Sequence, residues 1–275
     1  MSNIADTIKN DLITAINSNK LVLPTLPEAA LKVRDIAQSE DSATMDLVKV
    51  ISNDTALSAR LVRVCDSPLF RGSRPIKNLS MAVNRLGMTY TSSLAMGLAV
   101  EQMFQATSDM IDKRMRATWQ TSIEVTGICH FLTQNYTRLE PEQATLAGMV
   151  HLIGTLPILR YIEDNDVNIS GIVLDEIVAE LHPQIGSIIL KRWGFPADLQ
   201  EVPLLYNQFD RSPAKADYSD LVMMANLQRV AGTDHPWAQM DWSAISAFER
   251  LGLDPAASDD ENLDAQMAAA MAMLQ

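Results

Sequence analysis

Apolar side chains recur every three or four residues along most of this chain, which is the spacing of one face of an α-helix. The first such stripe consists of Ile4, Ile8, Leu12 and Ile16. A regular alternation of apolar and polar residues, which would predict strands, is missing, and the sequence contains neither an Asn-Gly nor an Asp-Gly hairpin turn. The pattern therefore predicts an all-α fold.

The stripes and the residues that start or stop helices set the predicted boundaries. In the first half, helices are expected over 3–17, 27–39, 43–53, 55–66, a segment ending at Gly87, 89–104 and 109–135. In the second half, one helix starts at Glu140-Pro141 and carries His151, one starts at His182-Pro183 and ends at Gly194, and one covers 214–231. Residues 66–78 are expected to form a loop, and Asp164-Asn165-Asp166 a turn.

Several polar residues stand where a helix cap is needed. Asp54 and Ser108 can each accept a hydrogen bond from the first turn of the helix that follows. Gly87 is expected to adopt a left-handed cap at a helix end. Ser258 and Glu261 have the spacing of a capping box. Behind that box lies an apolar stripe of Leu263, Met267, Met271 and Leu274, which we expect to close the bundle.

Composition agrees with a helical core and bears on localisation. The 275 residues are 47% apolar, with 15 Met and 11 Gly, and Met and Ala favour helices. The net charge of −12 argues against a nucleic-acid-coating protein, which needs a positive field. No secretory signal or bilayer-spanning run is evident, and two Cys residues do not form a disulfide framework. We expect a soluble, cytoplasmic protein that does not enter a membrane.

Two blocks of sequence resemble a known family. The first runs from Leu23-Pro24-Thr25-Leu26-Pro27-Glu28 through Ile51-Ser52-Asn53-Asp54 and Ala59-Arg60-Leu61 to Arg74-Pro75-Ile76 and Arg85-Leu86-Gly87. The second comprises Trp119-Gln120-Thr121-Ser122, Ala147 to Gly154, His182-Pro183-Gln184-Ile185-Gly186 and Trp193-Gly194-Phe195-Pro196. In this order they resemble the HDOD domain, the HD-related output domain of bacterial signalling proteins.

That resemblance implies an N-terminal helical lobe packed on a degenerate HD-like helical bundle. We expect a leading amphipathic helix at 1–19, an HDOD domain at 20–215 and a C-terminal helical extension at 216–275 that packs on the bundle. Within the domain, the N-terminal lobe would reach about residue 105 and the HD-like lobe would follow it. The family is similar to the HD phosphohydrolases, which bind metal, but generally lacks their ligands and has a regulatory or scaffolding role.

The resemblance also shows which metal ligands of an HD phosphohydrolase this chain would lack. The histidine–aspartate pair of that signature corresponds to His151-Leu152, so the carboxylate is replaced by an aliphatic side chain. The other positions correspond to Ser122, His182, the stretch around Asn207, and Asn226. Only two histidines then remain and both carboxylates are lost, which leaves a weak donor set. We expect His151 to be hydrogen-bonded within the bundle, Leu152 to pack in the core and His182 to cap a helix before Pro183.

The function that follows is a non-catalytic signal-transduction module that binds protein partners in trans and has no cofactor. One alternative is a metal-dependent phosphohydrolase of a nucleotide or phosphodiester that uses His151. A second is a nucleotide-sensing pocket without catalysis, because a cleft can outlast the loss of its metal.

Three other groups of residues are candidates for chemistry or binding. Cys129-His130 resembles a nucleophile and base, but neighbours on a helix point apart, so a buried core cysteine is the preferred interpretation. Asp164, Asp166, Asp175 and Glu176 could hold a cation loosely, although a solvated turn is preferred. A basic set, Arg60, Arg63, Arg71, Arg74, Lys77 and Arg85, could dock an anion or a partner. The same set could instead be a solvated face or pair with the acidic C-terminal segment.

Overall fold

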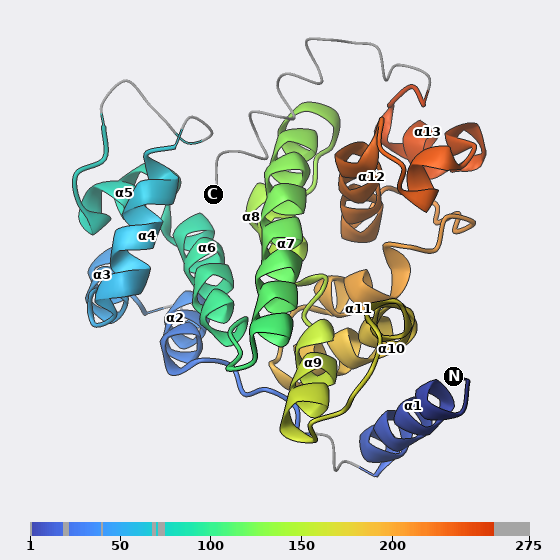
Figure 1. Cartoon of the computed structure of the whole chain (residues 1–275). Coiled ribbons are helices and arrows are strands. Elements are labelled where there is room, and N and C mark those ends of the chain that lie inside the picture. Colours follow the sequence, from blue (N-terminus) through green and yellow to red (C-terminus); the bar gives the residue numbers. More distant parts are fainter. Residues whose placement is uncertain (1, 19–21, 40, 68–69, 71–74, 256–275) are drawn as a thin grey trace.

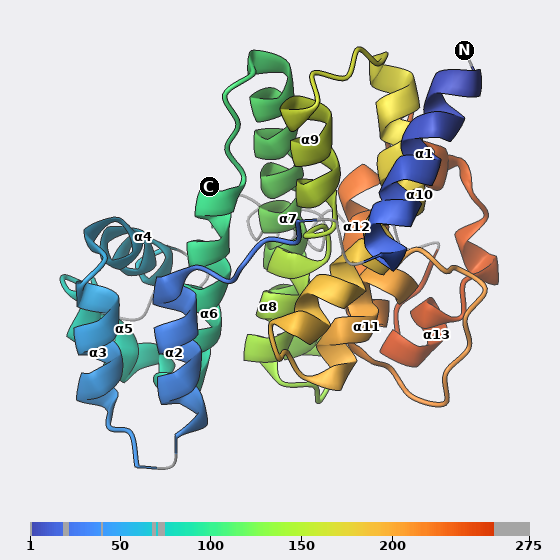
Figure 2. The ribbon, with the colours of Figure 1, turned by 90° about the horizontal axis from the view of Figure 1, so that it is seen from below.

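The structure is a computed structural model that describes residues 2–18, 22–39, 41–67, 70 and 75–255. Over these residues it is helical without a strand, as the sequence predicts. Helices α2 to α6 form a smaller group on one side, and α7 to α13 form the larger bundle (Figure 1). The N-terminal helix α1 lies against the larger group, beside α10, in both views (Figure 2).

The helices of the smaller group match the apolar stripes closely. They are α2 (Glu28–Gln38), α3 (Thr44–Ser52), α4 (Thr55–Cys65), α5 (Leu79–Leu86), α6 (Met88–Val100) and the 3₁₀ helix η1 (Glu101–Met103). Asp54 caps α4 by accepting a hydrogen bond from the amide of Leu57 at 2.9 Å, as expected. Gly87 ends α5 with a φ of 83° but a ψ of 167°. Its φ is positive, as predicted, but its conformation is not the left-handed helical one.

The larger bundle is built around the long helix α7. Its elements are α7 (Asp109–Tyr136), α8 (Pro141–Val150), α9 (Thr155–Asp164), α10 (Gly171–Arg192), α11 (Ala197–Leu205), α12 (Tyr218–Val230), η2 (Pro236–Gln239), η3 (Trp242–Ala244) and α13 (Ala247–Leu251). Helix α8 packs against both α7 and α6 and so joins the two groups. The leading helix α1 (Ser2–Asn17) buries Ile8 and Leu12 and pairs Lys9 with Glu180 of α10.

Two predicted boundaries are wrong. The helix expected to start at His182-Pro183 starts eleven residues earlier, at Gly171, and continues through Pro183. Proline removes one helical hydrogen bond, but Leu181 and Ile185 on either side are buried, so packing on the core outweighs that loss. The helix expected to carry His151 ends at Val150, and His151 stands at its C-cap position.

The turn that separates α8 from α9 brings the backbone close to α10. A Cβ atom built on Gly154 would lie 2.0 Å from the carbonyl oxygen of His182 and 2.5 Å from the amide nitrogen of Gly186. Only a residue without a side chain allows this approach. Gly154 therefore fixes the position of the segment that begins with His151 relative to His182.

A buried ionic cluster fixes the end of the described chain. Asp220 of α12 is fully buried and accepts two hydrogen bonds from Arg250 of α13, both at 2.8 Å, and one from Arg211 at 2.6 Å. Asp217 also pairs with Arg211 and caps α12 through the amide of Asp220. The predicted capping box at Ser258 and the stripe from Leu263 to Leu274 lie outside the described residues.

One segment has the length and composition of a membrane-spanning helix, although no such segment is expected from the sequence. Residues Pro141–Asp164, which cover α8, the turn and α9, are long and apolar enough to cross a bilayer by length and composition. However, 83% of the relevant window is buried inside the protein. Core helices of soluble proteins give the same signal, so this segment is explained by its place in the core.

Candidate functional site

His151 lies at the centre of the larger bundle and is fully buried. Its Nδ1 atom lies 2.7 Å from the carbonyl oxygen of Gly148, one turn earlier in α8. Because a carbonyl can only accept, Nδ1 carries the proton and donates it. The lone pair is therefore on Nε2, the atom that would have to bind a metal.

Asn226 of α12 occupies that lone pair. Its Nδ2 atom lies 3.3 Å from Nε2 of His151 and 2.9 Å from the carbonyl oxygen of Val222. The two N–H groups of the amide therefore each have an acceptor, and His151 is held as a neutral imidazole. An aspartate here would have no hydrogen to donate, so the amide suits the neutral histidine better than a carboxylate would.

Tyr206 fills the space between the two histidines of the expected site. Its ring lies edge-on to that of His151, with centroids 5.1 Å apart, and its hydroxyl lies 3.1 Å from Nε2 of His182. Tyr206 is buried among these groups. The ring nitrogens that face the common space are thus bonded to Asn226 and Tyr206, and the space itself holds an aromatic ring.

The remaining predicted site positions differ in burial and in partners. Ser122 of α7 is fully buried, and its hydroxyl has no hydrogen-bond partner among the described residues. Leu152 is half-buried and packs on the core, and Asn207 is half-buried next to Tyr206. His182 lies inside α10 and is buried, so the prediction that it caps a helix is wrong.

Burial keeps these histidines neutral. It lowers the pKa of His151 to about 3, with a smaller contribution from nearby His182 and Arg229, and it lowers the pKa of His182 to about 4. Burial also raises the pKa of the Tyr206 hydroxyl. A neutral imidazole can bind a metal, so the protonation state of these histidines is compatible with a metal ion, whereas the lone pair of His151 already accepts a hydrogen bond from Asn226.

The donor set does not fit the metal that HD phosphohydrolases bind. Among the described residues there is no group of three or more His, Cys, Asp or Glu side chains that could hold a metal ion. The set at this position consists of two neutral histidines, an amide and a phenol, without a carboxylate to offset the charge of a dication. The arrangement can accept and donate hydrogen bonds.

A cleft of about 370 Å³ opens beside this centre. Leu152, His182, Tyr206 and Trp237 line its aromatic and apolar side, and Thr118, Thr121 and Thr155 add hydroxyl groups. Arg114 and Asp175, which form an ion pair, also line it. Nδ1 of His182 has no hydrogen-bond partner among the described residues. The cleft is therefore large enough and polar enough for a small ligand.

The ligand pattern of the HD phosphohydrolases indicates histidines in the stretch around Asn207 and therefore does not indicate Tyr206, the preceding residue. The signal that could have identified it is its hydroxyl, since a buried tyrosine generally needs a hydrogen-bond partner, and two buried histidines were expected nearby.

Cys129 and His130 do not form a catalytic pair. Cys129 is fully buried, and burial raises the pKa of its thiol, so it is not a reactive thiolate. Instead, Nδ1 of His130 lies 2.6 Å from the hydroxyl oxygen of Tyr90, and the ring of His130 contacts Phe70 edge-on. The preferred interpretation of Cys129 as a small core residue is confirmed.

The basic set is partly engaged inside the protein. Arg60 is half-buried and forms an ion pair with Glu101 of η1. Arg63 and Lys77 are exposed, and Arg85 is half-buried. Arg71 and Arg74 lie outside the described residues. Of the described members, Arg63 and Lys77 are therefore the ones available to a partner on this face.

The four acidic residues that are candidates for binding a cation have different surroundings. Asp164 and Asp166 lie at the end of α9, which stops in the predicted turn, and Asp166 has a φ of 46°. Asp175 pairs with Arg114 of α7. Glu176, the next residue of α10, is exposed.

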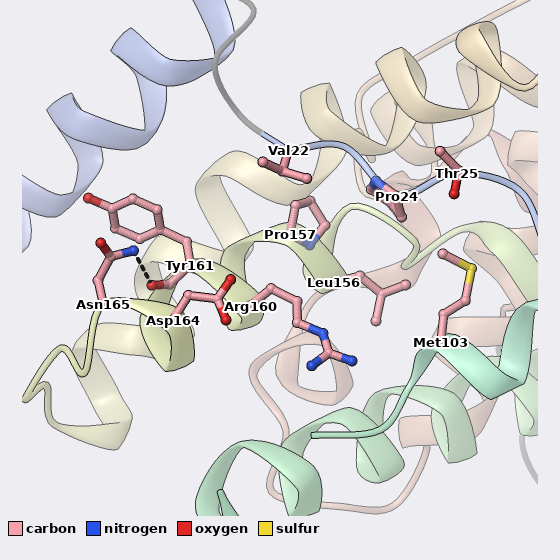
Figure 3. Close-up of a pocket in the computed structure, with 10 residues that line it drawn as sticks. All are labelled: Val22, Pro24, Thr25, Met103, Leu156, Pro157, Arg160, Tyr161, Asp164 and Asn165. Atoms are coloured by element: carbon pink, nitrogen blue, oxygen red, sulfur yellow. Dashed lines mark hydrogen bonds between the residues drawn. The ribbon is translucent and has the colours of Figure 1, made fainter. Parts of the chain in front are cut away.

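A second cavity, of about 500 Å³, lies between the segment Val22–Thr25 and α9 (Figure 3). Figure 3 shows Tyr161 and Asn165 at one end and Met103 of η1 at the other. Arg160 on its wall donates to the carbonyl of Gln105 at 2.5 Å and to Glu163 at 3.2 Å. Glu163 in turn accepts hydrogen bonds from the amides of Thr107 and Ser108, which fixes the start of α7.

Comparison with known proteins finds a family model and several solved structures that are similar to this chain. The HDOD domain model matches residues 23–208. The structure of a protein from Shewanella amazonensis SB2B, named a candidate metal-dependent phosphohydrolase, is similar over the whole of both chains, with 27% identity and a TM-score of 0.87. An HDOD domain protein of unknown function from Geobacter sulfurreducens is 19% identical, with 99% of this chain and 98% of that chain covered and a TM-score of 0.65.

Two further relatives are longer than this chain. A candidate signal transduction protein from Marinobacter aquaeolei VT8 is 21% identical with a TM-score of 0.64, and the match covers 98% of this chain and 65% of that one. An uncharacterized protein from Treponema pallidum (strain Nichols) is 23% identical over an alignment of 245 residues, and the match covers 82% of this chain and 46% of the relative. The chain thus spans about half the length of this curated relative.

Proposed function

Because this chain belongs to the HDOD domain family, we propose that it is a non-catalytic regulatory module of bacterial signal transduction that acts by binding protein partners in trans. A regulatory role fits the family and the signalling protein from Marinobacter aquaeolei VT8 that shares its fold. The cytoplasm is the compartment we propose for it.

The observation that carries the proposal is the occupied lone pair of His151. Asn226 donates to Nε2 of His151, and Tyr206 bonds to Nε2 of His182, with its ring in the space between them. Displacing these bonds would leave two buried polar groups without partners, at a cost of about 1–3 kcal/mol each. Metal binding would therefore have to compete with hydrogen bonds that are already made, and without help from a carboxylate.

The exposed members of the basic set give the partner surface that we propose. Arg63 of α4 and Lys77, in the segment before α5, are exposed on the smaller helical group. On a chain of net charge −12, a local cationic face favours an acidic partner and speeds their encounter. The partner of the module is accordingly an acidic surface of another signalling protein.

Affinity capture from the native bacterium tests this function. One bait combines Arg63→Glu with Lys77→Glu. The control bait combines Lys113→Glu with Arg138→Glu, which makes the same charge change at exposed positions of α7 and of the α7–α8 loop. We expect one recurrent protein with the native and control baits that is lost with the first variant. Recurrent failure to recover any specific protein, or equal recovery with all three baits, would contradict the proposal.

The alternative of a metal-dependent phosphohydrolase has one observation in its favour. The Shewanella amazonensis SB2B protein named a candidate for that activity is 27% identical and matches along its full length. Under this alternative, His151 would be a ligand in a non-standard set, and Asn226 and Tyr206 would have to move away. Hydrolysis of nucleotides or phosphodiesters that is lost in His151→Ala would support the alternative and refute a non-catalytic module.

A nucleotide-sensing pocket is the second alternative, favoured by the cleft beside Tyr206. Trp237 offers an aromatic face, and Arg114 and the threonine hydroxyls offer polar contacts. A thermal-shift screen with mono-, di- and cyclic nucleotides tests this idea. A shift that disappears in Trp237→Ala would support a sensing role, and uniform absence of shifts would rule out nucleotides as ligands.

A further inference from the structure

Two segments of the described chain pass between the larger bundle and the smaller helical group, and we call them the crossings. The first crossing, residues 22–27, precedes α2, and the second crossing, residues 104–108, leads from η1 to α7 (Figure 2). Nε1 of Trp193, at the end of α10, donates to the carbonyl oxygen of Pro24 at 3.0 Å. This bond holds the first crossing on the larger bundle.

The second crossing is held by α9. Arg160 donates to the carbonyl oxygen of Gln105, and Glu163 accepts from the amides of Thr107 and Ser108 at 2.8 and 2.7 Å. The two connections between the helical groups are therefore both fixed to the larger bundle by hydrogen bonds, one to α10 and one to α9.

The cavity of about 500 Å³ adjoins both connections (Figure 3). Val22, Pro24 and Thr25 of the first crossing line it, together with Met103, the residue before the second crossing, and residues of α9. Arg160, which holds the second crossing, is part of its wall. A molecule bound here would contact the first crossing, the start of the second and the helix that anchors the second.

Much of the reachable lining is apolar. Val22 is 88% exposed, and Pro24, Met103 and Tyr161 are half-buried, so all four present surface that an occupant can reach. Covering apolar surface is favourable, and a concave, mainly apolar site with a few polar groups is the usual form of a small-molecule site. The lining therefore favours an apolar occupant.

The charges on the wall favour an occupant without net charge. Arg160 and Asp164 both line the cavity, so an anion would meet the carboxylate of Asp164 and a cation would meet the guanidinium of Arg160. Arg160 is also engaged already, with Glu163 at 3.2 Å and with the carbonyl of Gln105. Neither wall charge is therefore free to neutralise a charged ligand.

The remaining polar groups are two hydroxyls on residues that are open to solvent. Thr25 is exposed and Tyr161 is half-buried, and neither side-chain hydroxyl bonds to another residue in the described part of the chain. The phenol ring of Tyr161 and the guanidinium plane of Arg160 are flat groups that stack on aromatic faces. A flat ring with one polar group at its edge fits this combination.

We propose that this cavity binds a neutral, planar aromatic molecule that carries a hydroxyl or N–H group at its edge. The ring covers the apolar surface of Val22, Pro24 and Met103, and the polar edge bonds to the hydroxyl of Thr25 or Tyr161. The bound molecule connects the two crossings through α9 and thereby favours one arrangement of the two helical groups. It supplies the module with a small-molecule input.

This site lies apart from the partner surface at Arg63 and Lys77. Neither residue lines the cavity, and ligand binding is measured without any partner protein. The proposal can therefore fail while the proposed function holds, and the reverse is also possible.

Thermal unfolding of the full chain with 2-naphthol and with indole tests the proposal. The matched probes are decahydro-2-naphthol, which has the naphthol skeleton without a flat ring, and 2-naphthoate, which has the flat ring with a negative charge. At least one of the neutral aromatic probes should raise Tm by about 3 °C at a concentration about ten times its Kd. Decahydro-2-naphthol and 2-naphthoate should give smaller shifts at the same concentration.

A pair of exposed positions provides the matched variants. Val22→Asp places a charge on the cavity wall at a side chain that is 88% exposed, so the fold should be kept while the shift is lost. Met45→Asp makes the same kind of change at a side chain of α3 that is 64% exposed and lies outside the cavity. This control should keep the shift of the native protein.

Hydrogen exchange locates the bound probe. The neutral aromatic probe should slow exchange of the amides of residues 22–26, 104–108 and 160–165 in native protein and in Met45→Asp, but not in Val22→Asp. The proposal is wrong if neither neutral aromatic probe shifts Tm, or if the saturated or the anionic probe shifts it as much. It is also wrong if the shift survives in Val22→Asp or if exchange slows only elsewhere in the chain.

Discussion

The hydroxyl of Tyr206 lies 3.1 Å from Nε2 of His182, and the ring that carries it stands edge-on to His151. This contact connects the residue after α11 with the middle of α10. It also places an aromatic ring where two histidines of an HD-type site would converge on an ion. The hydrogen bonds of Tyr206 and Asn226 therefore fix the two buried histidines in the bundle.

Removing the hydroxyl of Tyr206 should weaken the fold without opening a cavity. Tyr206→Phe keeps the ring but leaves Nε2 of His182 buried without its partner, which should lower the free energy of unfolding by about 1–3 kcal/mol. Urea denaturation followed by circular dichroism measures this change. Tyr136→Phe, at an exposed position of α7, should leave the midpoint unchanged. Equal midpoints for native protein and Tyr206→Phe would show that the bond contributes nothing.

Stability should fall as the pH drops below the pKa of an unfolded histidine. Burial lowers the folded-state pKa of His151 to about 3 and those of His130 and His182 to about 4, whereas an unfolded histidine titrates near 6.5. Between these values the unfolded chain binds protons that the folded chain does not. The stabilisation is therefore complete above about pH 6.5 and is lost as the pH falls toward the folded pKa values.

Three such histidines predict a slope of about 4 kcal/mol per pH unit well below pH 6.5. Urea unfolding between pH 7.5 and 5 measures this slope before most carboxylates begin to titrate. A free energy of unfolding that stays constant across this interval would mean that the three histidines are not buried in the neutral form.

Gly154→Ala should disrupt the contact between the α8–α9 turn and α10. The added Cβ would lie 2.0 Å from the carbonyl oxygen of His182, a backbone atom that cannot move without shifting the helix. The loss should exceed the ~1–3 kcal/mol that overpacking usually costs, and much of the protein should be insoluble on expression. The matched control is Gly171→Ala, whose Cβ would meet only the flexible side chain of Arg114. Similar midpoints for both variants would contradict this reading of Gly154.

Asp220→Asn should separate α13 from the bundle. The carboxylate of Asp220 is fully buried between Arg211 and Arg250, and removing one partner of a buried ion pair costs about 3–5 kcal/mol. Hydrogen exchange should show faster exchange of the α13 amides in this variant. In the control Asp241→Asn, which changes an exposed carboxylate at the cap of η3, α13 should exchange as in the native protein. Unchanged exchange in Asp220→Asn would show that the cluster does not anchor α13.

Much of this fold could be predicted from local sequence because the helices carry clear apolar stripes and caps. The positions of Asp54 and Ser108 gave the starts of α4 and α7, and Gly87 gave the end of α5. The start of α10 could not be predicted in the same way. Pro183 is unfavourable in a helix interior, and the buried neighbours that outweigh it become visible only in the packed bundle.

The site was predicted as a set of positions but not as a chemical arrangement. His151 and Asn226 were expected as former ligand positions, and the structure brings them together with His182 around Tyr206. Their contacts depend on which carbonyl and which ring lie beside them in the fold, and no spacing in the sequence encodes that.

Metal content tests the central claim most directly. The protein should be purified without a metal-affinity tag, and iron, manganese and zinc should be measured in native protein and in His151→Ala by mass spectrometry of the elements. Our account predicts sub-stoichiometric metal in both proteins, because Asn226 donates to the lone pair of His151 and the ring of Tyr206 stands between His151 and His182. Stoichiometric metal in the native protein that is lost in His151→Ala would contradict it.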